Sequence, residues 1–311
     1  MECFNYQCAK VVWMQKGADN GLLKKYDEMS REECNWLFSD NKFWLIYISI
    51  LYELTKYDYA EKILKKYIKY FGLKDIEKYG LVSMLAYKLR YSNDKIKASA
   101  RAMNILETSI QDNLLYKYTK NKSIAIVGNS PSGIGLKQGK EIDNHDIVIR
   151  FNNYSLQGYE EDYGKQTDIW MRNGGSDINR RSNVSDFGQV VLSVDYRHFE
   201  LNESIVEFIN ENTNKGIIIT GIPSESFFEL YKTSRISWPT AGLIIFWYLK
   251  KYGLVKKIDL YGYSFLNKKN TEDFHYYKNN TSKQFKEIYR QVGIYHNMNG
   301  ESEFIKYLLR L

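Results

Sequence analysis

The stretch that decides the fold runs from Ser123 to Gly135 and reads SIAIVGNSPSGIG. Its first five residues form a near-continuous apolar run, which is typical of a strand buried on both faces of a parallel sheet. A loop rich in Gly, Ser and Asn follows, in which glycines let backbone N–H groups approach a phosphate and Asn129 and Ser130 offer hydrogen bonds. The loop lacks the Gly-Lys-Ser/Thr ending of a P-loop and the full glycine fingerprint of dinucleotide-binding folds, so a plain tight turn stays open.

Apolar runs of the same kind recur downstream and alternate with helical patterns. We expect strands at 123–127, 147–151, 168–171, 190–194, 216–220 and 258–262. Strands that alternate with helices predict an α/β fold with a doubly wound, Rossmann-like, mostly parallel sheet and flanking helices. Ligands of such sheets bind at the carboxyl ends of the strands, so the loops after the strands are the candidate site.

The residues before the first strand show helical spacing of apolar side chains almost throughout. We expect helices at 31–57, 59–71, 76–91 and 95–116, with Gly72 ending the second of them. The sequence therefore predicts two domains, an all-helical one at 1–118 and an α/β one at 119–311. The Lys-rich face of the helix at 59–71 is either a solvated surface or a membrane-binding one.

Composition limits the partners and the compartment. The chain has 44 Lys+Arg against 37 Asp+Glu, a net charge of +7 that suits an anionic ligand or a membrane surface but not a nucleic acid. All three cysteines lie within the first 34 residues, which indicates a reducing compartment. The most apolar segment, 43–51, is far shorter than the roughly 20 residues of a bilayer span. We expect a cytoplasmic protein, with peripheral contact at the inner face of the cell membrane left open.

Two further segments carry groups suited to an anionic ligand. The run EIDNHDIVIRFNN at 141–153 places Asn152 just past a strand end, where we expect a ligand contact, while Arg150 is a candidate anchor for a structural carboxylate. The run WPTAG at 238–242 opens a helix, and free N–H groups at a helix start attract an anion. An ordinary helix cap is the alternative interpretation of that second run.

Two of the four histidines lie near the carboxyl terminus. His275 stands in the run FHYYK at 274–278, and His296 precedes Glu301 by five positions. A lone histidine more often has a structural role than a catalytic one, although its ordinary pKa suits general base work near neutral pH. By themselves, these two positions leave both roles open.

Together, and in this order, the five segments resemble the sialyltransferases of glycosyltransferase family 29. The large motif of that family is similar to 124–168, and its small motif to 238–242 running on to 259–262. Its third motif is similar to 275–277, and its very small motif to His296 with Glu301. Where the animal enzymes have a disulfide, the matching positions here are Ile124 and Val255, and Lys278 replaces an acidic residue. These departures fit a bacterial member in a reducing cytosol.

The resemblance implies a variant GT-A-like fold and an inverting transfer of a sialic-acid-type sugar from a CMP-activated donor, without cofactor or metal. The acceptor would be a hydroxyl of a glycan, lipid-linked or not, in the synthesis of a bacterial surface polysaccharide or lipo-oligosaccharide. His296 would act as the base and His275 would stabilise the leaving phosphate, with Glu301 orienting local structure. The implied donor-binding residues are Gly128, Asn129, Ser130, Asn152, Thr240, Ala241, Gly242, Tyr261, Gly262 and Tyr276.

Three other functions remain to be weighed. A transferase for another CMP-activated sugar acid such as Kdo would have the same nucleotide-binding residues, because the sugar pocket is not encoded in these motifs. A non-catalytic nucleotide-binding protein is disfavoured, since a dead site need not retain both His275 and His296. A Rossmann oxidoreductase is disfavoured by the missing third glycine of its fingerprint.

Overall fold

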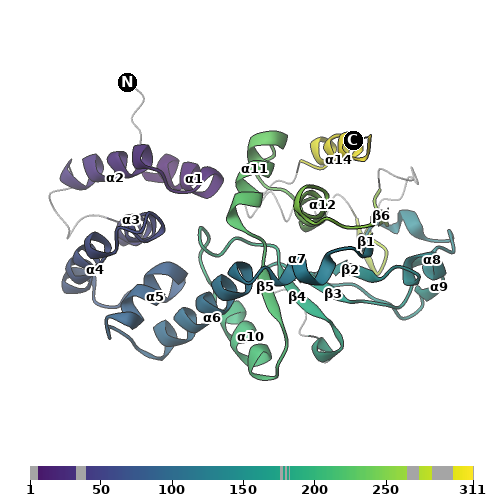
Figure 1. Cartoon of the computed structure of the whole chain (residues 1–311), viewed down its shortest axis with the longest axis horizontal. Coiled ribbons are helices and arrows are strands. Elements are labelled where there is room, and N and C mark those ends of the chain that lie inside the picture. Colours follow the sequence, from purple (N-terminus) through teal and green to yellow (C-terminus); the bar gives the residue numbers. More distant parts are fainter. Residues whose placement is uncertain are drawn as a thin grey trace.

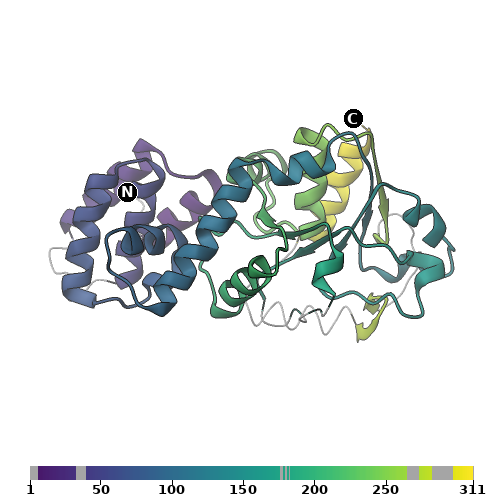
Figure 2. The ribbon, with the colours of Figure 1, turned by 60° about the horizontal axis from the view of Figure 1, so that its bottom comes forward.

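The computed structural model describes residues 6–32, 40–175, 178, 181, 183–264, 273–281 and 297–310. The described part of the chain before the sheet consists of helices, as predicted; the first of them lie together at one end of the molecule, and the last two extend to the sheet (Figures 1 and 2). They are α1 (Tyr6–Lys16), α2 (Asn20–Glu32), α3 (Asn41–Glu53), α4 (Tyr57–Phe71), the 3-10 turn η1 (Ile76–Lys78), α5 (Gly80–Lys88), α6 (Asp94–Gln111) and α7 (Leu114–Thr119). None of the helices described has both the length and the apolar character needed to cross a bilayer.

Six parallel strands form the sheet, in the order β5-β4-β3-β2-β1-β6. They are β1 (Ser123–Val127), β2 (Ile147–Phe151), β3 (Ile169–Arg172), β4 (Gln189–Leu192), β5 (Ile219–Gly221) and β6 (Lys257–Tyr261). This arrangement confirms the predicted α/β fold. The chain adds strands outward on one side of β1 and then returns to place β6 on its other side. The β1/β6 junction is therefore the topological switch point, where parallel sheets bind their ligands.

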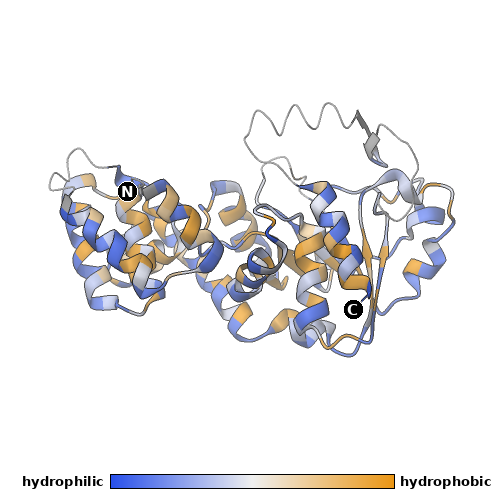
Figure 3. Cartoon of the chain, turned by 90° about the horizontal axis from the view of Figure 1, so that it is seen from above, coloured by the Kyte–Doolittle hydropathy of each residue, from blue (hydrophilic) through white to orange (hydrophobic). Residues whose placement is uncertain are grey.

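Helices cover both faces of this sheet, together with shorter elements at its edges (Figure 1). They are η2 (Pro131–Gly133), α8 (Gly139–Asp143), α9 (Glu160–Tyr163), η3 (Val184–Asp186), α10 (Glu203–Asn214), α11 (Ser224–Ser234), α12 (Ala241–Tyr252) and α14 (Met298–Arg310). A separate hairpin pairs β7 (Asp273–His275) with β8 (Lys278–Thr281). The sheet strands are among the hydrophobic segments in Figure 3, which agrees with their burial.

Two hydrophobic cores sandwich the sheet. On one face, Ile124 and Ile126 of β1 pack with Leu243 and Phe246 of α12 and with α11 and α14. On the other face, Trp170 of β3 packs with side chains of α6 and α10. The long helix α6 thus belongs to the helical stretch by sequence and to the core of the sheet by packing. The boundary at residue 118 stays a prediction.

The predicted bounds were closest where burial is continuous. The runs 123–127 and 147–151 coincide with β1 and β2, whereas β5 starts only at residue 219 because Gly216 turns the chain at φ +81°. The predicted helix at 76–91 is interrupted at the extended Tyr79, and the one at 95–116 breaks at Asn113, whose φ of +55° is left-handed. Gly72 ends α4 as expected, at φ +62°.

Candidate functional site

Two glycines let the loops after β1 and β6 touch at the switch point. A Cβ on Gly128 would lie 2.6 Å from the carbonyl oxygen of Gly262, and a Cβ on Gly262 would meet the carbonyl oxygen of Gly128. The loops are joined by hydrogen bonds from Gly128 N to the Tyr261 carbonyl, 2.8 Å, and from Ser130 N to the Gly262 carbonyl, 3.0 Å. Gly262 also has a φ of +64°, which favours glycine. Both glycines are therefore required by the close approach of the two loops.

The two asparagines predicted to bind ligand are both tied to neighbouring loops. The side-chain amide of Asn129 donates to the carbonyls of Phe151 and Asn153, at 3.2 and 3.1 Å, and so joins the end of β1 to the end of β2. Asn152 has a φ of +46°, and its side-chain oxygen accepts a hydrogen bond from Asn173 N at 2.9 Å. These contacts shape the carboxyl edge of the sheet; ligand contact by either residue stays a prediction.

Tyr163 of α9 forms two hydrogen bonds to the loop after β1. Its hydroxyl donates to the Ser130 carbonyl at 2.6 Å and accepts from Gly133 N at 3.0 Å. The hydroxyl of Ser130 itself accepts from Ser132 N at 3.3 Å and caps the 3-10 turn η2. The loop therefore ends in a single short turn, and its backbone is held by a buried tyrosine that the sequence did not single out.

The hairpin of β7 and β8 brings His275 and Tyr276 to the same place. The backbone N–H of Tyr276 donates to the Asn129 carbonyl at 3.0 Å, so the hairpin is bonded directly to the loop after β1. The Tyr276 ring stacks on Tyr163 with centroids 4.1 Å apart, and its hydroxyl donates to the Ser155 carbonyl at 2.8 Å. Burial raises the pKa of Tyr276 to about 12. Half-buried His275 stacks on Tyr277 at 5.2 Å.

The start of α12 is held by a carboxyl group from the last helix. Thr240 caps the helix by accepting from Leu243 N, and its own backbone N–H and hydroxyl donate to Glu301 at 2.8 and 2.6 Å. Glu301 is 3% exposed, and burial raises its pKa to about 7. A Cβ on Gly242 would lie 2.7 Å from the Tyr263 hydroxyl, so this glycine makes room for the loop after β6. Glu301 thus orients local structure, as expected.

Tyr261 and Arg150 contact protein groups. The hydroxyl of Tyr261 donates to Glu141 at 3.0 Å, and burial raises the pKa of this tyrosine above its ordinary value. Arg150 is 1% exposed and donates to the carbonyls of Tyr163 and Gln166, at 2.7 and 2.9 Å. Carbonyl oxygens therefore take the place of the structural carboxylate that was one expectation for Arg150.

The structure brings most of the predicted site together at one edge. The loops after β1, β2 and β6 and the β7–β8 hairpin contact one another there, while Glu301 fixes the start of α12. His296 lies outside the described residues. The supporting contacts of Tyr163 and the partner of Thr240 could not be predicted, because they join positions 30 and 61 residues apart in the chain.

The fold and this edge define a Rossmann-like α/β protein whose candidate ligand-binding loops meet at the β1/β6 switch point. Residues 76–220 match the model of glycosyltransferase family 29 (sialyltransferase), which confirms the resemblance over this stretch. The match ends before the runs at 238–242 and 275–277 and before His296.

Curated relatives and solved structures that are similar to this chain include sialyltransferases. A β-galactoside α-2,6-sialyltransferase 2 of Takifugu rubripes is 37% identical over 24% of this chain and 14% of its own length. A type 2 lactosamine α-2,3-sialyltransferase of Rattus norvegicus is 24% identical over 61% of this chain and 62% of its own. The crystal structure of a mammalian sialyltransferase in complex with Gal-β-1-3GalNAc-ortho-nitrophenol is 17% identical, with a TM-score of 0.44 over 68% of this chain and 81% of that one. The chain thus spans less than two thirds of either curated relative.

Proposed function

We propose that this chain is an inverting glycosyltransferase that moves a sialic-acid-type sugar from a CMP-activated donor to a glycan hydroxyl, without a metal. The family match over 76–220 supports the reaction class. One observation carries the proposal for the site: the 3.0 Å hydrogen bond from Tyr276 N to the Asn129 carbonyl. This bond holds the hairpin that bears His275 against the glycine-rich loop at the switch point, where a nucleotide of an α/β protein binds.

The donor is an anion, and the start of α12 suits its phosphate. By helix geometry the N–H groups of Ala241 and Gly242 have no partner inside the helix, and the helix dipole makes this end positive. Glu301 holds Thr240, so these two N–H groups are held in place before the donor arrives. Donors fixed in advance stabilise developing charge without reorganising during the reaction.

The sugar is transferred in a single displacement at its anomeric carbon. The acceptor oxygen forms a bond to the anomeric carbon as the bond from that carbon to the CMP phosphate oxygen breaks. His296 takes the acceptor's hydroxyl proton, which is general base catalysis. The charge that grows on the departing phosphate is stabilised by His275 and by the helix start.

We assign a partly exposed aromatic pair to the acceptor side. Trp238, 38% exposed, lies two residues before Thr240, and Phe199 from the loop after β4 packs edge-on against it with centroids 5.8 Å apart. Aromatic faces suit the apolar faces of a ring-shaped ligand such as a sugar. The names of the relatives make β-galactosides the first acceptors to try. A lipid-linked bacterial surface glycan, made at the cytoplasmic face of the membrane, is the biological setting we propose.

The test is CMP release. The full chain is incubated with CMP-sialic acid and with CMP-Kdo separately, in EDTA, with and without lactose or a Gal-β-1-3GalNAc aryl glycoside. We expect acceptor-dependent CMP release from CMP-sialic acid, and a large loss of kcat on His275→Ala. Release from CMP-Kdo alone would assign the other sugar acid, and CMP binding without turnover of either donor would favour a non-catalytic nucleotide-binding protein.

A further inference from the structure

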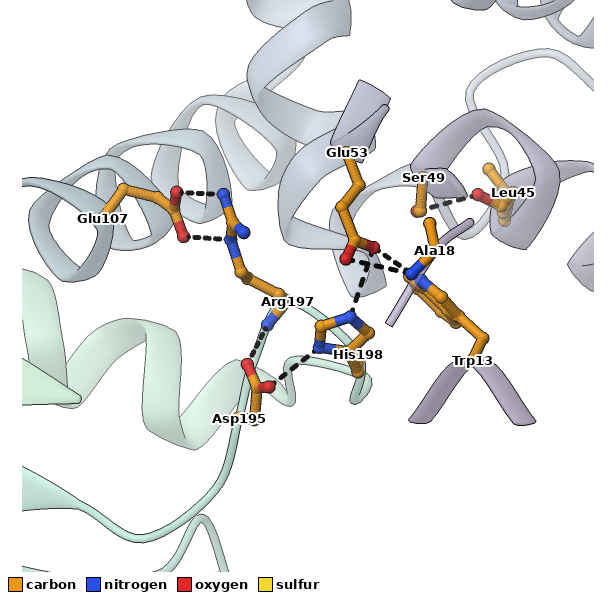
Figure 4. Close-up of polar contacts among 9 residues, drawn as sticks. All are labelled: Trp13, Ala18, Leu45, Ser49, Glu53, Glu107, Asp195, Arg197 and His198. Atoms are coloured by element: carbon orange, nitrogen blue, oxygen red, sulfur yellow. Dashed lines mark hydrogen bonds and ion pairs between the residues drawn. The ribbon is translucent and has the colours of Figure 1, made fainter. Parts of the chain in front are cut away.

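The loop after β4 is fastened to the N-terminal helices by buried charges. This loop, residues 193–201, leaves the carboxyl edge of the sheet, where the candidate site lies. Figure 4 shows His198 of this loop between Asp195 of the same loop and Glu53 of α3. Nδ1 of His198 lies 2.8 Å from Asp195, and Nε2 lies 3.2 Å from Glu53. The two carboxylates come from positions 142 residues apart (195 − 53), so the cluster joins the start of the chain to the site edge.

The cluster is largely buried, and its members are hydrogen-bonded to one another. The His198 side chain is 0% exposed and packs against the rings of Trp13 and Phe228, at 4.8 and 5.2 Å. Glu53 also accepts from Trp13 Nε1 at 2.7 Å and from Ala18 N at 3.1 Å. A buried charge that loses its partner is strongly destabilising, so this contact is sensitive to the loss of a single group.

Two further side chains, Arg197 and Glu200, hold the same loop to the helices. Arg197 makes a bidentate pair with Glu107 of α6, with both N–O distances 2.8 Å. Glu200 lies 3.3 Å from Lys42 at the start of α3 and accepts from the Tyr79 hydroxyl at 3.2 Å. Phe199 therefore lies between anchored neighbours on the chain: the side chains of 197, 198 and 200 are bonded to the helices, and the ring of 199 packs against Trp238.

The second member of the aromatic pair is anchored to the same helices. Trp238 follows α11, and α11 packs against α1. The contact is close, because a Cβ on Gly17, directly after α1, would lie 2.8 Å from the ring of Phe228 in α11. Both chain segments that carry the pair are thus held by the N-terminal helices. Neither segment is bonded to the sheet by an ion pair among the described residues.

We infer that the N-terminal helices are a positioning element of the acceptor side of the site, acting through Glu53 and His198 on the Phe199–Trp238 pair. The inference rests on the proposed function for the meaning of that pair. Glu53 and His198 are positioning residues, because they act through the loop and not on the reacting atoms. Among the residues described, the cluster shares no hydrogen bond with the loops after β1 and β6, which we assign to the donor side.

The experiment separates acceptor from donor. In Glu53→Gln, which keeps the size of the side chain and removes its charge, we expect the KM for lactose to rise at least fivefold. The Kd for CMP should stay within twofold. Ser49→Ala is the matched control, because it removes a buried hydrogen bond to Leu45 one turn earlier in α3 without touching the loop. Asp195→Asn, which perturbs the cluster from the loop, serves if Glu53→Gln does not fold.

A second readout does not depend on activity. Hydrogen exchange of peptides covering 193–201 and 236–240 should accelerate together in Glu53→Gln and stay unchanged in Ser49→Ala. Acceleration confined to 193–201 would overturn the inference, and so would an unchanged lactose KM or an equal loss of CMP affinity. If the wild-type chain turns over no donor, the proposed function fails, and the exchange at 236–240 still decides whether the helices position Trp238.

Discussion

Replacing Gly262 by alanine tests whether the crossing of the loops after β1 and β6 builds the donor side. The left-handed φ of +64° costs an alanine about 1–2 kcal/mol. The new Cβ would also meet the backbone carbonyl of Gly128 and lie 3.0 Å from the Tyr163 ring. Because a backbone oxygen cannot swing away, the two loops must separate, at a further cost of about 1–3 kcal/mol. We expect a total loss of about 3 kcal/mol, or about 5 °C in Tm for a chain of 311 residues.

The matched control is Gly216→Ala. Gly216 has a φ of +81° and no atom within 4 Å of an added Cβ, so it carries the backbone strain without the collision. Thermal unfolding followed by circular dichroism should show a larger loss of Tm in Gly262→Ala than in Gly216→Ala. Calorimetric titration should show that CMP affinity falls about tenfold, or by about 1.4 kcal/mol of binding free energy, in Gly262→Ala and not in the control. Equal Tm losses in the two variants, or unchanged CMP affinity in Gly262→Ala, would refute the reasoning.

Three further outcomes are expected. Burial by itself lowers the pKa of His198, but Asp195 and Glu53 outweigh this effect and raise the pKa to about 9. The stability that the protonated imidazole gives is full below pH 6.5 and is lost as the pH rises through 9. The fall in Tm at alkaline pH should therefore shrink in His198→Gln. Burial raises the pKa of Glu301 from 4.5 to about 7, so folding loses up to about 3 kcal/mol as the pH rises between these values, and Glu301→Gln should flatten that part of the Tm profile. His296→Ala should abolish transfer while CMP affinity, measured by titration, stays nearly intact; loss of CMP binding would assign the base to another residue.

The local signals that succeeded were those a short segment carries by itself. A strand buried on both faces must be apolar throughout, so Ser123–Val127 and Ile147–Phe151 could be located from composition alone. Helix interruptions at Tyr79 and Asn113 were missed, because both stand inside good helical patterns and depend on a backbone angle that these residue types do not require.

The site was predicted as a set of loops, and its internal contacts were not. Glycines at 128, 242 and 262 were predicted to bind the donor, yet each faces a neighbouring loop or side chain that fills the space of a Cβ. Asn129 and Asn152 were selected for their polarity, and the structure engages both in bonds between loops. The sequence shows which side chains can form hydrogen bonds, whereas the partner of each one depends on how the loops pack.

By itself, the sequence determined the alternation of strands and helices after residue 119, the mostly parallel sheet, and the resemblance that the family match over 76–220 confirms. These follow from periodicity and motifs, which short segments carry independently of one another. Only the tertiary structure decided three hydrogen-bonded pairs: Glu301 with Thr240, Tyr276 with Asn129, and Glu53 of the helical part with His198. Such contacts join residues that are far apart in the sequence, and they form only when whole helices and strands pack together. The pattern of residues along the chain does not show which distant residues become neighbours.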